Sequence, residues 1–89
     1  MFRLYIRHRV DDFAAWRKEY DAFDAERRSL GVVGDAVYQK VGDPTDVTVW
    51  HDFDTAEAAE SLMASDPLRQ AMTIGRVLGQ PEMWVTTEA

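Results

Sequence analysis

The sequence contains no cysteine among its 89 residues. Disulfides, thiolate metal sites and cysteine nucleophiles are therefore excluded, and the absence fits a reducing compartment. Long apolar runs are also missing, since none approaches the roughly 18 residues that a membrane-spanning helix needs. Arg3, Arg7 and Arg9 interrupt the segment where a signal peptide would have its apolar core. We therefore expect a cytoplasmic protein without a membrane partner.

Basic residues are outnumbered by acidic ones. The chain has 10 Lys and Arg against 16 Asp and Glu, which gives a formal net charge of -6 at pH 7. Such a surface would repel a phosphate backbone, so we expect no nucleic-acid partner. Repeats, linkers, zinc signatures, nucleotide fingerprints and Ser-His-Asp spacings are absent as well. We expect residues 1–89 to form a single domain, of a size that often supplements its core by oligomerising.

What the sequence does contain is a regular order of strand and helix patterns. The expected elements are a strand over 2–10, a helix over about 12–29, a hairpin of strands over 32–41 and 46–54, a helical region from Asp54 to about residue 80 that is broken near Ser65–Pro67, and a final strand over 82–88. Asp11 or Asp12, and then Asp54 and Asp66, offer N-cap oxygens for the helical segments.

The first helix carries apolar residues at helical spacing. The row consists of Phe13, Trp16, Tyr20, Phe23 and Leu30, with Arg27 in its one polar slot. This row predicts an amphipathic helix packed on a core. The charge-rich segment DAERRS, residues 24–29, is most simply a solvated helix face.

This order of elements predicts an α+β fold, a ferredoxin-like β-α-β-β-α-β antiparallel sheet. Right-handed crossovers would place both helical regions on one face of the sheet and leave the other face bare. Strand alternation assigns aliphatic residues and one methionine to the helix-packed face: Leu4, Ile6, Val47, Val49, Met83 and Val85. It assigns larger side chains to the opposite face: Tyr5, Arg7, Tyr38, Trp50 and Trp84.

That opposite face predicts an interface. Exposed patches rich in Tyr, Trp and Arg usually mark contact surfaces, so we expect a homodimer formed sheet against sheet. The alternative is a solvated face that carries large side chains. Asp52 shares the face and is expected to pair with Arg3 or Arg7.

Both histidines, His8 and His51, lie on the helix-packed side of their strands. Because the third strand runs antiparallel to the first, we expect them near opposite ends of the sheet, and we expect no metal site. Two interpretations stay open for each residue. It is either a neutral, hydrogen-bonded histidine at the core edge, or a donor or proton acceptor at a cavity between sheet and helices.

The segments YIRHRVDDFAAWRKEYDAF, VTVWHDFDTAEAAE and ASDPLRQAM resemble the dimeric α+β-barrel superfamily, and within it the antibiotic biosynthesis monooxygenase-like group. The resemblance covers nearly the whole chain and is carried by pattern rather than by a unique motif. It implies two sheets paired into a barrel across a homodimer, with a ligand cavity inside each subunit. That cavity would be bordered by His8, Trp16, Tyr20, His51, Phe53 and Met72.

The resemblance also implies an activity. Enzymes of the group oxidise aromatic, polyketide-like substrates with dioxygen and no cofactor, and relatives cyclise polyketides, isomerise lactones or degrade haem. This chain contains no asparagine, a residue that both the quinone-forming oxygenases and the haem degraders use. Haem degradation is therefore disfavoured, and we expect no cofactor.

Two functions stay open. The first is a cofactor-independent monooxygenase, or an isomerase or cyclase, that acts on a small planar aromatic molecule. His51 would be its first candidate base and His8 its second, and the pocket aromatics with Met72 would hold the ring system. The second is a non-catalytic dimeric module that binds a small ligand or serves as a structural unit. A cavity near about 300 Å³ would favour the enzyme, and a filled core would favour the module.

Overall fold

A computed structural model describes all 89 residues. The elements in chain order are β1 (Phe2–Val10), α1 (Phe13–Ala22), α2 (Asp24–Ser29), β2 (Val32–Lys40), β3 (Asp43–Phe53), α3 (Ala56–Met63), α4 (Asp66–Ile74) and β4 (Val77–Thr87). This is the expected β-α-β-β-α-β order, with each helical region divided in two. None of the helices is long and apolar enough to cross a membrane.

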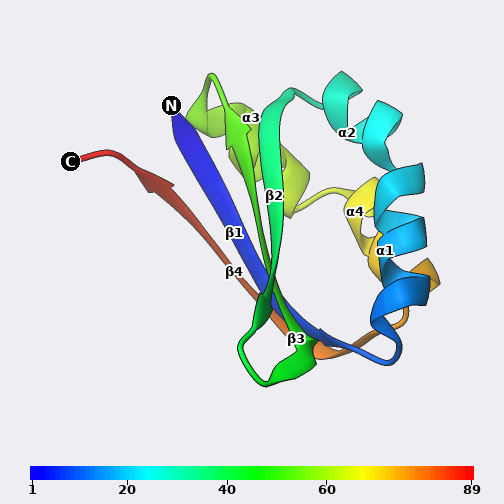
Figure 1. The fold of residues 1–89 in the computed structure, drawn as a ribbon. Coiled ribbons are helices and arrows are strands. Elements are labelled where there is room, and N and C mark those ends of the chain that lie inside the picture. Colours follow the sequence, from blue (N-terminus) through cyan, green and yellow to red (C-terminus); the bar gives the residue numbers. More distant parts are fainter.

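The four strands form one antiparallel sheet in the order β2-β3-β1-β4. All helices lie over one face of this sheet, and both chain termini lie at the same end of it (Figure 1). The strand order and the one-sided helical layer confirm the ferredoxin-like α+β fold. The register pairs Tyr5 of β1 with Trp50 of β3 on one side and with Trp84 of β4 on the other.

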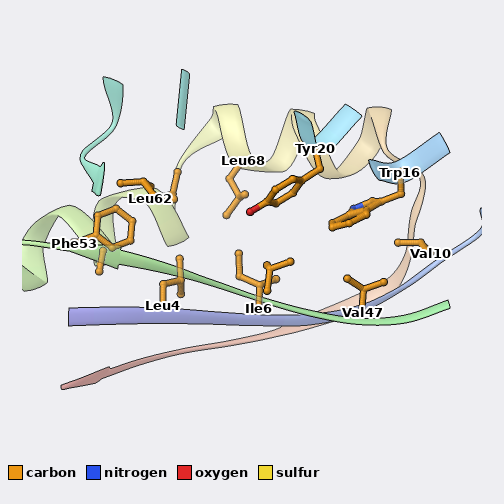
Figure 2. Packing of buried hydrophobic residues seen from close by; sticks show 12 residues of the cluster. Leu4, Ile6, Val10, Trp16, Tyr20, Val47, Phe53, Leu62 and Leu68 are labelled. Atoms are coloured by element: carbon orange, nitrogen blue, oxygen red, sulfur yellow. The ribbon is translucent and has the colours of Figure 1, made fainter. Parts of the chain in front are cut away.

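The core lies between the sheet and the helices, as strand alternation predicted. Leu4, Ile6, Val47 and Val49 are buried there, and Met83 and Val85 pack against them. The full set of buried apolar residues is Leu4, Ile6, Val10, Trp16, Tyr20, Val32, Val47, Val49, Phe53, Ala59, Leu62 and Leu68. Figure 2 shows Trp16 and Tyr20 reaching down from the helical layer toward the aliphatic side chains of the strands.

The expected single helix over 12–29 is two helices, because the α-helical bonding is disturbed at Phe23. The Phe23 amide is shared between the carbonyls of Glu19 and Tyr20, at 3.1 and 3.3 Å, which tightens this turn. Asp12 caps α1 as predicted, since its carboxylate accepts a hydrogen bond from the Ala15 amide at 3.2 Å. Beyond α2 the chain turns at Gly31, where φ is +102°.

The caps of the second helical region differ from the prediction by one residue. Thr55, not Asp54, is the N-cap of α3, and its hydroxyl accepts a hydrogen bond from the Ala58 amide at 3.2 Å. Ser65, not Asp66, caps α4 in the same way. Thr and Ser are good caps in their own right, so neighbouring candidates cannot be ranked by residue type alone. The break between α3 and α4 falls where it was expected.

Strand β4 starts earlier than the predicted residue 82. Its register against β1 shifts, because Arg7 pairs with Glu82 whereas Arg9 pairs with Leu78. Gly79 takes φ +67° within this irregular stretch. A bulge on an edge strand accommodates both the glycine and the following proline, so the expected helix-ending segment GQP is part of the strand.

The sheet face away from the helices carries the predicted aromatic and arginine residues. Tyr5 and Trp84 stack with ring centroids 5.3 Å apart, and the Arg3 guanidinium lies 3.8 Å above the Trp50 ring. Tyr38 and Trp84 are 55% and 41% exposed.

Each arginine of β1 is paired with an aspartate of β3. Arg3 makes two hydrogen bonds to Asp52 at 2.7 and 3.0 Å, and this pairing was predicted. The other two pairs are Arg7 with Asp46 and Arg9 with Asp43. The alternating arginines of the first strand therefore hold β1 to β3 across this face.

Candidate functional site

A small cavity lies between the sheet and the helical layer. Its volume is about 40 Å³, and the residues around it come from β1, β3, α1, α2 and α4, with Gly75 just beyond α4. Five of the six residues predicted to border a ligand cavity line it: His8, Trp16, Tyr20, His51 and Met72.

The structure does not bring the sixth residue, Phe53, to this cavity. Phe53 is fully buried at the end of the core where Leu62 lies, away from Trp16 (Figure 2). It pairs with Phe2 at the end of β1 and packs near Gly31. Although Phe53 shares the face of His51, it lies two residues further along β3, beyond the cavity.

A row of aromatic rings joins the two histidines along the cavity. The His8 ring meets the Trp16 ring edge-on at a centroid distance of 5.4 Å. Trp16 lies 5.0 Å from Tyr20, and Tyr20 lies 6.1 Å from His51. The successive rings are tilted by 64°, 33° and 47° to one another, so they form a continuous aromatic row rather than one flat surface.

Arg27 is the unexpected member of the site. It lies in the segment that we interpreted as a solvated face, yet it is only 1% exposed and lines the cavity. Its Nε donates to His51 Nε2 at 2.9 Å, and one terminal nitrogen donates to the Tyr20 carbonyl at 2.9 Å. Its guanidinium lies 3.8 Å above the Tyr20 ring. Arg27 thus ties α2 to α1 and to β3.

The bond from Arg27 defines the state of His51. Burial, followed by the positive charge of Arg27, lowers the pKa of His51 to about 4. The imidazole is therefore neutral at pH 7. Because Arg27 can only donate, His51 accepts at Nε2 and carries its hydrogen on Nδ1. That Nδ1 is buried and has no hydrogen-bond partner.

Tyr20 is held protonated by its surroundings. Burial raises its pKa, and so does the hydrogen bond that its hydroxyl donates to Asp35 at 2.6 Å. Burial would also raise the pKa of Asp35, but the bonds from Tyr20 and Arg28 outweigh this and lower it. Tyr20 therefore contributes its ring to the cavity while its hydroxyl is engaged with β2.

His8 is buried with fewer polar contacts. Its Nδ1 has no hydrogen-bond partner, and burial lowers its pKa, so the ring is neutral at pH 7. The register places His8 opposite Val47 and His51 opposite Leu4, four residues apart on β1 and so roughly 13 Å along the sheet. The chain holds no cluster of three or more His, Cys, Asp or Glu side chains arranged to bind a metal ion.

Eight of the lining residues were not predicted to border the cavity, and besides Arg27 they include Phe23 and Gly75. Phe23 lies at the break between α1 and α2. A Cβ on Gly75 would lie 3.1 Å from the Trp16 ring, so the glycine lets α4 approach α1 closely. No sequence motif marks either residue, because both depend on how the two helices meet.

The layers define a ferredoxin-like α+β protein with a small cavity between the sheet and the helices. A crystal structure described as an antibiotic biosynthesis monooxygenase matches 100% of this chain and 99% of its own, with a TM-score of 0.76 and 7% identity. SnoaB, a cofactor-independent oxygenase from Streptomyces nogalater, matches 99% of this chain and 92% of its own, with a TM-score of 0.80 and 13% identity. A protein from Methanosarcina mazei Go1 matches over the same shares, with a TM-score of 0.78 and 13% identity.

The chain therefore has the fold of the antibiotic biosynthesis monooxygenases over its whole length, which confirms the resemblance in sequence pattern. No protein-family model and no curated protein sequence matches it. At these identities the likeness is one of fold, and a fold alone does not define a reaction.

Proposed function

We propose that this chain is a cofactor-independent monooxygenase-like protein that binds a small planar aromatic molecule in the cavity between sheet and helices. One observation carries the proposal. His8 and His51 line the same cavity, and each has a buried Nδ1 without a hydrogen-bond partner. Buried polar atoms are almost always paired, and a ligand is one way to pair these two. The match to SnoaB over nearly the whole chain supports the same reading.

The contacts of the histidines favour His8 as the base. The Nε2 lone pair of His51 is occupied by the Arg27 N–H, and its low pKa makes it a weak base. His8 is also neutral at pH 7, but no guanidinium bonds to its ring. Its Nδ1 or Nε2 would accept the acidic proton of the substrate, and His51 would act as a donor through Nδ1–H. This reverses the order of the two candidate bases suggested by the sequence.

The experiment is oxygen consumption with 1,8-dihydroxyanthrone. Its methylene carbon would lose both hydrogens and gain one oxygen atom from dioxygen as a carbonyl, and the second oxygen atom would leave as water. We expect the purified protein to consume oxygen and His8→Gln to lower the rate by about 100-fold or more, the usual scale for a lost general base. Arg69→Gln is the matched control, because Arg69 is exposed on α4 and pairs only with Asp66.

Two results would contradict this proposal in different ways. Full oxygen consumption by His8→Gln would rule out His8 as the base. Binding of the anthrone without oxygen consumption by the wild-type protein would rule out the monooxygenase.

The size of the cavity favours a second candidate, a non-catalytic module of the same fold. About 40 Å³ is far below the roughly 300 Å³ at which ligand pockets begin. A planar aromatic molecule therefore requires the helical layer to move outward. A protein that neither consumes oxygen nor binds any flat aromatic would be this module.

We also propose that the chain forms a homodimer through the sheet face that carries Tyr5, Arg7, Tyr38, Trp50 and Trp84. Trp84 and Tyr38 are exposed in the single chain, and Tyr, Trp and Arg are the types enriched at interface centres. The Arg–Asp pairs across β1 and β3 leave this face with its charges largely matched. A second copy of the same face would then cover the aromatic rings without burying unpaired charge.

A further inference from the structure

We propose that the cavity selects an anion and that Arg27 holds its charged oxygen, so that the ligand is the ionised form of a flat acid: a phenolate, enolate or carboxylate. This inference rests on the proposed function only in treating the cavity as a ligand site. It adds the charge of the ligand and the residue that recognises it.

The hydrogen bonds of Arg27 leave donors free. A guanidinium has five N–H groups, and the structure uses three of them, for His51, Asp24 and the Tyr20 carbonyl. Two N–H groups of a side chain that is 1% exposed therefore have no partner within the protein. A carboxylate or phenolate oxygen would satisfy them with charge-assisted hydrogen bonds.

The charged residues near the cavity are distributed unevenly between its lining and its surroundings. Asp24 and Asp35 balance Arg27 and Arg28 in number, but neither aspartate lines the cavity. Arg27 does line it, with its guanidinium bonded to a neutral His51 whose Nδ1–H is also free to donate. An anion would thus meet one cation, which Asp24 pairs from outside the cavity, one neutral donor, and the carboxylate of Glu19.

The one acidic residue that lines the cavity is Glu19, at its outer side. Glu19, Phe23 and Ala71 also line a surface groove of about 170 Å³ beside α1 and α4. Since the groove and the cavity share these three residues, the apolar body of a ligand would lead outward through the groove, past Glu19 and Glu26. The anionic oxygen would lie inside at Arg27, and Phe23 would have to move to admit the rings.

The test is calorimetric binding of two probes of nearly equal shape, 2-naphthoate and neutral 2-naphthamide, at pH 7.5. We expect the wild-type protein to bind the naphthoate at least tenfold more tightly. Arg27→Gln should reduce naphthoate affinity to that of the amide, and Arg27→Lys should retain part of the preference because the charge stays. Arg69→Gln, an exposed arginine on α4, should change neither affinity.

Equal affinity of the wild-type protein for both probes, or no binding of either, would overturn the anion site. The wild-type comparison and Arg27→Lys still decide the question if Arg27→Gln does not fold. If the protein consumes oxygen with the anthrone but does not prefer the naphthoate, the proposed function stands and only the anion-binding role of Arg27 is rejected. Naphthoate preference without oxygen consumption would support the anion site and reject the oxygenase.

Discussion

Arg27 and His51 form a buried hydrogen-bonded pair at the cavity. A buried arginine that donates to a buried imidazole keeps the imidazole neutral and fixes which nitrogen carries its hydrogen. The same bond removes the Nε2 lone pair of His51 from proton transfer. In the proposed function, His51 would therefore act as a donor, and His8, whose ring no guanidinium bonds, would accept the proton.

The low pKa of His51 predicts a pH-dependent stability. The unfolded chain binds a proton at His51 below the ordinary value of 6.5, whereas the folded chain does so only near 4. The free energy of unfolding should therefore fall as the pH drops from about 6.5 to about 4, by roughly 3 kcal/mol from this group. Urea unfolding of wild-type and His51→Gln proteins across this range measures the effect.

Comparison of the His51→Gln variant with the wild-type protein separates the contribution of His51 from that of carboxylates that titrate in the same pH range. Its free energy of unfolding should vary less steeply between pH 6.5 and 4 than that of the wild-type protein. Identical slopes in the two proteins would show that the pKa of His51 is not lowered by folding.

The helical position of Arg27 could be predicted from the sequence, but its burial could not. Its place in the row of Phe13, Trp16, Tyr20 and Phe23 was visible at helical spacing, and all of these residues except Phe13 line the cavity. A charged residue in such a row predicts a buried charge as readily as a solvated one. Whether Arg27 is buried or solvated depends on its hydrogen-bond partner His51 on β3, which lies 24 residues away along the chain.

At the scale of elements, periodicity predicted the four strands and the two helical regions, while the break between α1 and α2 and the ends of the elements required the structure. The strand alternation of residues 2–10 corresponds to β1, and the break near Ser65–Pro67 corresponds to the gap between α3 and α4. The early start of β4 was missed because Gly79 and Pro81 are usual helix and strand breakers, which a bulge on an edge strand tolerates.

The cap of α3 gives a direct test of one such boundary. Thr55→Ala should lower the free energy of unfolding by about 1 kcal/mol, because the Ala58 amide would lose its partner. Asp54→Ala should have a much smaller effect, since Asp54 lies before the cap. Thermal or urea unfolding of both variants compares them, and a larger loss for Asp54→Ala would place the cap where the sequence alone put it.

At the scale of the whole molecule, the sheet presents two faces of different character. The helix-packed face encloses the cavity, and the opposite face carries exposed aromatic rings beside paired arginines. Alternation along the strands was enough to separate these faces from the sequence. The volume of the cavity was not predictable, because it depends on how closely α4 approaches Trp16 at Gly75.

The sheet face predicts the outcome of a charge substitution. Trp84→Glu should convert a homodimer to monomers, measured by light scattering after size exclusion, because each subunit would have to bury a carboxylate in the interface. Ile74→Glu is the matched control, since Ile74 is 63% exposed on the helical side of the molecule. A wild-type protein that is monomeric at all concentrations would reject the homodimer.

The most direct test of the ligand site is an NMR titration of the three tryptophan indoles with 1,8-dihydroxyanthrone, assigned with single Trp→Phe variants. Trp16 lines the cavity, whereas Trp50 and Trp84 lie on the other face of the sheet. We predict that the Trp16 signal shifts in a saturable way while the signals of Trp50 and Trp84 stay in place. Shifts confined to Trp50 and Trp84, or none at all, would contradict a ligand site between sheet and helices.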